Sequence, residues 1–135
     1  MIVLDTNVVI ALLLRSPDIV RLRFTSALAS QTTVAVPVIA LFELQYGIAR
    51  GTRRSENEQR LADFQRAPIV ILPFEVEDAV IAGEVRAGLV AKGTPIGPYD
   101  TLIAAQALRH SATLITANTR EFARVQGLRL EDWTK

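Results

Sequence analysis

The sequence contains no cysteine and only one histidine, His110, among its 135 residues. Without cysteine the chain forms no disulfide, thiolate nucleophile, iron–sulfur site or cysteine-type zinc site. One histidine is too few for zinc sites built on two or three of them. A Ser-His-Asp triad would have to use His110. That residue falls at the polar end of a predicted helix, and we interpret it as a surface histidine whose positive charge complements the helix dipole.

Long hydrophobic runs are also absent. The apolar stretch from Val8 to Leu14 is far shorter than the roughly 20 residues that cross a bilayer. The N-terminal segment reaches Asp5 without the basic start and longer apolar run of a signal peptide. We therefore expect a cytoplasmic protein that makes no membrane contact.

Neither sign of charge is in marked excess, since the formal net charge is +1. Half of the residues are hydrophobic and 21% are charged, which argues against disorder, and the length suggests one domain over residues 1–135. Lysine is scarce, with Lys92 and Lys135 the only two among 15 basic residues. The other basic residues are arginines, whose planar fork matches phosphate oxygens.

Short apolar runs alternate with longer segments of helical character along the chain. The runs predict strands buried on both faces, and the alternation predicts an α/β fold with a parallel sheet and helices on both sides. The expected strands are 2–4, 33–36, 69–72, 113–116 and, at an edge, 128–130. The expected helices are 5–14, 16–30, 37–50, 55–66, 75–92, 98–110 and 120–124.

Polar residues follow the predicted strands at the sheet edge where parallel α/β proteins bind ligands. Asp5 follows the first strand directly, and Thr116 and Asn118 lie at and just past the fourth. Glu43 lies in a segment that is apolar on nearly every helical face, so we expect that it cannot easily reach water, and a buried carboxylate without a partner costs several kcal/mol. Asp100 lies in the first turn of an apolar helix, whose N-terminus favours the ionised form.

Three acids at three element ends suit a hard cation such as Mg²⁺ or Mn²⁺. Such an ion activates water and neutralises a phosphate during transfer. Each acid also has a purely structural interpretation. Asp5 can serve only as a helix N-cap, Asp100 only as a first-turn acid, and Glu43 as the partner of an arginine elsewhere in the fold.

Four segments, in order along the whole chain, resemble the motifs of PIN domains. The opening MIVLDTNVVIALL is similar to the first motif, VIALFELQYGIAR to the second, KGTPIGPYDTLIAAQA to the third, and LITANTREFARVQGLRLEDW to the C-terminal segment. The last two are particularly like the VapC toxins of bacterial type II toxin–antitoxin modules.

The resemblance implies a single PIN domain over residues 1–135, with a three-layer α/β/α fold around a central, mainly parallel sheet of four to five strands. It implies a Mg²⁺-dependent endoribonuclease, with Mn²⁺ as an alternative ion, that cleaves tRNA or other structured RNA. It further implies a homodimer that a VapB-type antitoxin inhibits and that reaches operator DNA only through that antitoxin. The metal-binding and catalytic residues carried over are Asp5, Glu43 and Asp100.

One position departs from the family pattern, since Asn118 stands where an aspartate is usual. An asparagine oxygen can ligate or accept a hydrogen bond but brings no charge, so a second tightly held metal ion is in doubt. The hydroxyls of Thr6 and Thr116 are expected to orient the carboxylates, or else to serve in ordinary capping and strand-end hydrogen bonds.

Arginines are the candidates for holding RNA. Arg86 lies on the helix ahead of Asp100 and is expected to approach the site and pair with an acid or a phosphate. Arg50, Arg53 and Arg54 flank a polar turn, and a solvated surface is the alternative for all four. The apolar excess of residues 8–14 suggests an antitoxin groove or a dimer interface in addition to core.

Two other functions stay open at this point. Small α/β phosphatases also place acids after strands, and they would act on phosphomonoesters and spare RNA. A catalytically weak PIN-like binding or regulatory module is the second alternative, supported by Asn118 and opposed by the three retained acids. Nucleotide binding is disfavoured because no glycine-rich phosphate loop follows a strand.

Overall fold

The computed structural model describes all 135 residues. In chain order its elements are β1 (Ile2–Leu4), α1 (Thr6–Leu14), α2 (Asp18–Ala29), β2 (Val34–Pro37), α3 (Val38–Arg50), α4 (Arg54–Phe64), β3 (Val70–Leu72), α5 (Val76–Ala91), α6 (Pro98–Arg109), β4 (Thr113–Ile115), α7 (Thr119–Phe122) and β5 (Arg129–Glu131). These elements confirm the predicted α/β class, and their boundaries lie within a few residues of the predicted ones.

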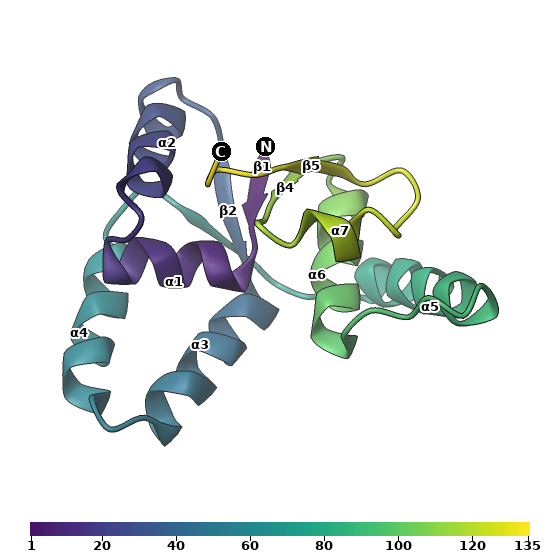
Figure 1. Ribbon diagram of the computed structural model, residues 1–135, viewed down its shortest axis with the longest axis horizontal. Coiled ribbons are helices and arrows are strands. Elements are labelled where there is room, and N and C mark those ends of the chain that lie inside the picture. The colour runs from purple at the N-terminus through teal and green to yellow at the C-terminus, as the bar shows by residue number, and fades with distance from the viewer.

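The five strands form one sheet in the order β3-β2-β1-β4-β5, and every neighbouring pair is parallel. Parallel neighbours need crossover connections, which are usually helical. Figure 1 shows α1 to α4 on one side of the sheet and α5 to α7 on the other, which confirms the three layers. No helix combines the length and the apolar character needed to cross a bilayer.

The central strands form the middle of the core, as their apolar sequences predict. Val3, Leu4 and Leu114 are fully buried, because helices cover both faces of the sheet there. The prediction that β3 is also a buried strand was wrong. Val70 is exposed and Ile71 is half-buried, because β3 lies at the edge of the sheet and pairs only with β2.

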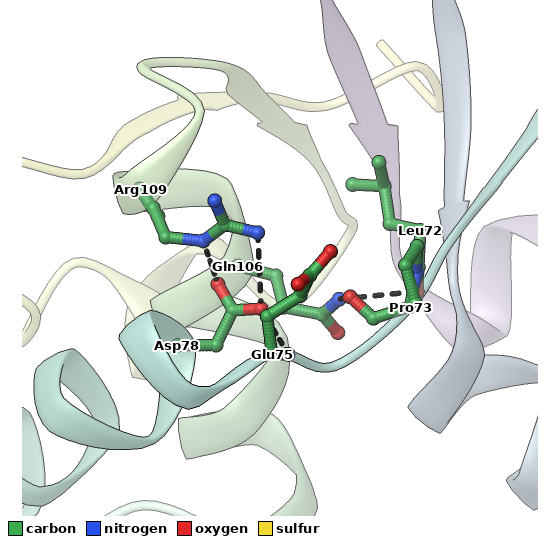
Figure 2. Close-up of polar contacts among 6 residues, drawn as sticks. All are labelled: Leu72, Pro73, Glu75, Asp78, Gln106 and Arg109. Atoms are coloured by element: carbon green, nitrogen blue, oxygen red, sulfur yellow. Dashed lines mark hydrogen bonds and ion pairs between the residues drawn. The ribbon is translucent and has the colours of Figure 1, made fainter.

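A buried polar network joins α5 to α6 (Figure 2). Asp78, which is fully buried, accepts hydrogen bonds from the guanidinium of Arg109 and from the backbone N–H of Glu75. Burial alone would raise the pKa of Asp78, but these hydrogen bonds and the arginine charge hold it below its ordinary value. On the same helix as Arg109, the amide of Gln106 donates to the last carbonyl of β3 and to the one after it. The network therefore fixes α6 relative to both α5 and the sheet.

Candidate active site

Asp5 lies where β1 ends and α1 begins. Its Oδ1 accepts a hydrogen bond of 2.8 Å from the N–H of Thr6, and its Oδ2 accepts one of 2.8 Å from the hydroxyl of Thr116. Burial raises the pKa of Asp5, repulsion from Glu43 and Glu121 adds to the rise, and the two hydrogen bonds oppose it. Asp5 is therefore both a helix cap and a member of a group of acids.

Glu43 on α3 is tied to α1 through Thr6, whose hydroxyl donates a hydrogen bond of 2.7 Å to Oε1. The prediction that Glu43 cannot easily reach water was wrong. The residue is half-buried and lines an open groove, because α3 leaves its neighbours Phe42 and Tyr46 exposed. Glu43 also forms no ion pair, so the alternative of a partner arginine is not found.

Asp100 lies in the first turn of α6, two residues after Pro98 begins the helix. Its carboxylate is turned back toward Gly97, where a Cβ atom would lie 3.2 Å from Oδ2. Glycine therefore leaves room for this arrangement. Burial is the main reason that the pKa of Asp100 is raised to about 6, and repulsion from the neighbouring acids adds to it. Burial and repulsion thus outweigh the effect of the helix N-terminus, which was expected to favour the ionised form.

Sequence reasoning missed a fourth acid, Glu121, on α7. Its Oε1 accepts a hydrogen bond of 3.0 Å from the N–H of Gly97, and its Oε2 accepts one of 2.9 Å from the side chain of Asn118. These hydrogen bonds lower the pKa of Glu121. A signal was present in the sequence, because Glu121 follows the fourth strand and lies three residues after Asn118, on the same helical face.

Thr116 connects these groups at the end of β4. The residue is fully buried, and its hydroxyl donates to Asp5 while accepting a hydrogen bond of 3.0 Å from the N–H of Asn118. The structure therefore brings together the predicted Thr6, Thr116 and Asn118 with the acids, and both threonine hydroxyls donate to carboxylates.

Repulsion among the acids raises the pKa values of Asp5 and Asp100, whereas the charge of Arg124 helps to lower the pKa of Glu121. Each of the four acids comes from a different helix or helix start. They lie close enough that three of them, Asp5, Glu43 and Glu121, raise the pKa of Asp100. None forms an ion pair with lysine or arginine. Such a donor set of carboxylate oxygens without ion-pair partners fits a hard divalent cation.

The arrangement suits a hydrated ion rather than a closed cage. No group of three or more acidic or histidine side chains has a geometry that would hold a metal ion by itself. Mg²⁺ in enzymes commonly keeps several water molecules and takes only one or two carboxylates together with substrate phosphate. The carboxylates present therefore suit a partly hydrated divalent cation and do not form an all-protein metal site.

A groove of about 550 Å³ adjoins the acids and runs between α1, α3 and the start of α6. Thr6 and the acid Glu43 line one end of the groove. Arg50 lines the groove two turns further along α3. Two turns correspond to about 10 Å along a helix axis. We call it the aromatic groove, because its wall also contains the aromatic residues Phe42, Tyr46 and Tyr99.

The predicted arginines are dispersed. Arg50 lies at the aromatic groove with its guanidinium carbon 5.5 Å from the ring centre of Tyr46. Arg54 pairs with Glu58 on the surface, at 2.9 Å. Arg86 is exposed on α5 and lines a different pocket, and its pairing with a phosphate stays a prediction. It forms no ion pair, so the expected pairing with an acid is not found. The reason is that α5 lies outside α6, on the far side from the site (Figure 1).

His110 caps the C-terminal end of α6, whereas Asp100 lies at the other end of that helix. Its Nε2 is buried without a hydrogen-bond partner, so the residue is less exposed than the predicted surface histidine. Its position places the only imidazole of the chain away from the acids.

Known proteins resemble this chain over nearly its whole length. The PIN domain family matches residues 2–128. Ribonuclease VapC2 of Rickettsia felis is 36% identical over 132 residues, which are 98% of this chain and 97% of that protein. The tRNA(fMet)-specific endonuclease VapC of Salmonella typhimurium is 35% identical over 130 residues, 96% of each chain.

A solved structure gives the same result for the fold. A chain of VapBC2 from Rickettsia felis, bound to a DNA fragment from the promoter of the pair, superimposes with a TM-score of 0.92 at 35% identity. The match covers 98% of this chain and 99% of the other.

Proposed function

The chain belongs to the PIN-domain family, as one of its VapC ribonucleases, and from this membership we propose that it is a Mg²⁺-dependent endoribonuclease toxin. The observation that carries it is the group of carboxylates without ion-pair partners at the carboxyl edge of the sheet, in a chain whose relatives are named ribonucleases.

The roles of the acids follow from their surroundings. We propose that Asp5 and Asp100 hold the ion; Asp100, with a pKa of about 6, is mainly ionised at neutral pH. Glu43 has Oε1 fixed by Thr6, which leaves Oε2 to bind the ion or to accept a hydrogen bond from the attacking water. The ion, when bound, supplies positive charge that activates water and stabilises the phosphate oxygens. Thr116 keeps Asp5 oriented through its hydroxyl.

We propose tRNA as the substrate. The relative from Salmonella typhimurium is named for cleavage of tRNA(fMet), and it matches this chain over 96% of both lengths. The partner we propose is a VapB-type antitoxin, because the similar structure from Rickettsia felis is a VapBC complex. That complex is bound to promoter DNA, which supports operator binding of this chain through its antitoxin. We also propose that this chain forms a homodimer.

Cleavage of a total tRNA pool tests the enzymatic proposal. The purified chain, free of antitoxin, is incubated with tRNA in Mg²⁺ and in EDTA, beside an Asp100→Asn variant. We expect discrete fragments that require both the metal and Asp100, whereas Asp63→Asn, an exposed acid on α4, should cleave as the wild type does.

Two results would contradict the proposal. Release of phosphate from a phosphomonoester, with tRNA left intact, would favour a phosphatase. Intact tRNA and intact phosphomonoester in every lane, from folded protein, would favour a binding module whose site has lost its activity.

A further inference from the structure

The exposed aromatic side chains of the protein all lie at the aromatic groove. The chain has five phenylalanines, two tyrosines and one tryptophan. Among these, the ones exposed are Phe42 at 51%, Tyr46 at 62% and Tyr99 at 45%, and all three line the groove beside the acids. Exposed apolar surface that gathers at one place usually marks a binding site.

The rings have a defined arrangement. Phe42 on α3 and Tyr99 on α6 meet edge to face, with ring centres 5.4 Å apart and planes at 68°. Tyr46, one turn further along α3, has the guanidinium of Arg50 at 5.5 Å from its ring centre. The groove thus runs from the carboxylates past three rings to a guanidinium.

We propose that the aromatic groove is a subsite for unpaired RNA nucleotides next to the bond that is cut. This inference rests on the proposed ribonuclease function. Bases that are not paired expose their faces and stack on aromatic side chains and on arginine, whereas bases inside a duplex do not. Arg50 at the far end offers its fork to a backbone phosphate. The substrate class is therefore single-stranded or looped RNA in preference to duplex.

The lining of the groove favours RNA over an apolar protein segment. Apart from the three rings, Ile10 is its only hydrophobic residue, and the remaining lining residues are polar, charged or glycine. Flat rings among polar groups suit bases attached to a charged backbone. The carboxylate end repels phosphate unless a cation is present, so the phosphate to be cut is the one that needs the metal ion.

Substitutions at Tyr46 separate stacking from simple apolar contact. Tyr46→Phe keeps the ring, whereas Tyr46→Leu keeps an apolar side chain without one. In cleavage of tRNA, we expect Tyr46→Leu to raise KM about 5- to 100-fold, the range expected for loss of one stacked base, and to leave kcat nearly unchanged. Tyr46→Phe should behave as the wild type does. Leu22→Ala on α2 is the control, because Leu22 is also 62% exposed but does not line the groove.

Binding without cleavage gives a second readout. Tyr46 and Tyr99 are the only tyrosines of the chain, so fluorotyrosine labelling gives two fluorine NMR signals, both from the groove. In the Asp100→Asn variant with Mg²⁺, a short single-stranded RNA of mixed sequence should shift both signals. The same strand annealed into a duplex should shift neither.

Several outcomes would overturn the subsite. Equal RNA affinity and KM in Tyr46→Leu and wild type would do so, as would equal losses in Tyr46→Leu and Tyr46→Phe, or unshifted fluorine signals. If Tyr46→Leu weakens self-association or antitoxin binding while RNA binding is unchanged, the groove holds protein instead. The NMR experiment does not depend on cleavage, so a chain that binds single strands but cuts nothing refutes the proposed function and not the subsite.

Discussion

Replacing Asp100 by asparagine should stabilise the metal-free protein while it abolishes metal-dependent cleavage. The pKa of Asp100 is raised from an ordinary 3.8 to about 6, first by burial and then by repulsion from Asp5, Glu121 and Glu43. Between these two pH values the folded state binds more protons than the unfolded state does. The free energy of unfolding therefore falls as pH rises through this window, and an uncharged asparagine removes that loss.

The size of the effect follows from the shift in pKa. The shift is about two units, and each unit corresponds to about 1.4 kcal/mol, so the upper limit is about 3 kcal/mol. Asp100 is only partly buried and solvent screens its charge, which reduces the expected gain to about 1–2 kcal/mol. For a domain of this size, that gain raises Tm by roughly 3–8 °C.

Thermal unfolding in EDTA, followed by circular dichroism between about pH 4 and pH 8, measures this difference. The gap in Tm between Asp100→Asn and wild type should be near zero at the acid end, grow as pH rises from about 3.8 to about 6, and stay constant above that window. Added Mg²⁺ should narrow the gap at neutral pH, because it stabilises only the protein that keeps the carboxylate.

Asp132→Asn is the matched control, with the opposite sign. Hydrogen bonds from Thr134 lower the pKa of Asp132, so its contribution to stability is present above the ordinary pKa and is lost as pH falls through the lowered one. That variant should melt below the wild type at neutral pH. An Asp100→Asn protein that melts at or below the wild type near neutral pH, or a gap that does not change with pH, would refute the reasoning.

Three further substitutions probe the supports of the site. Thr116→Val removes the hydroxyl that donates to Asp5; we expect a loss of about 1–3 kcal/mol in urea unfolding and roughly tenfold slower cleavage, and unchanged values for both would contradict its role. Arg109→Leu leaves the buried Asp78 without its partner, so it should cost about 3 kcal/mol in the same assay. Because the pKa of Asp78 is lowered, that difference should be largest above about pH 4 and shrink below it; an equal difference at every pH would argue against the ion pair. Asn118→Asp places a carboxylate against Glu121, which now accepts a hydrogen bond from Asn118. The variant should have a lower Tm than the wild type in EDTA, and added Mg²⁺ should restore the Tm. A higher Tm in EDTA would show that the two carboxylates do not repel each other.

Much of the fold was predictable because local signals agree with the tertiary structure. The apolar runs at 2–4 and 113–116 became the central β1 and β4, where burial on both faces demands such sequences. β3 has an equally apolar sequence but lies at the edge of the sheet, and Val70 is exposed there. Hydrophobicity along the chain does not report strand order, so sequence alone could not separate the centre from the edge.

The site was predictable to the extent that strand ends define it. Asp5, Thr116 and Asn118 follow parallel neighbours, β1 and β4, whose carboxyl ends meet at one edge, so their convergence follows from topology. Asp100 was found because an acid in the first turn of an apolar helix stands out. The expected ion pair of Arg86 with an acid is not found, since a position on a helix does not tell which neighbour the helix packs against.

The sequence by itself determined the parallel α/β architecture and the identities of three of the converging acids, because strand-end position and apolar context are local properties. Only the tertiary structure decided that Glu121 joins them, since its two donors, Gly97 and Asn118, come from separate parts of the chain. It alone also gathered the exposed rings into one groove, because α3 and α6 are brought together by packing and not by their spacing in the sequence.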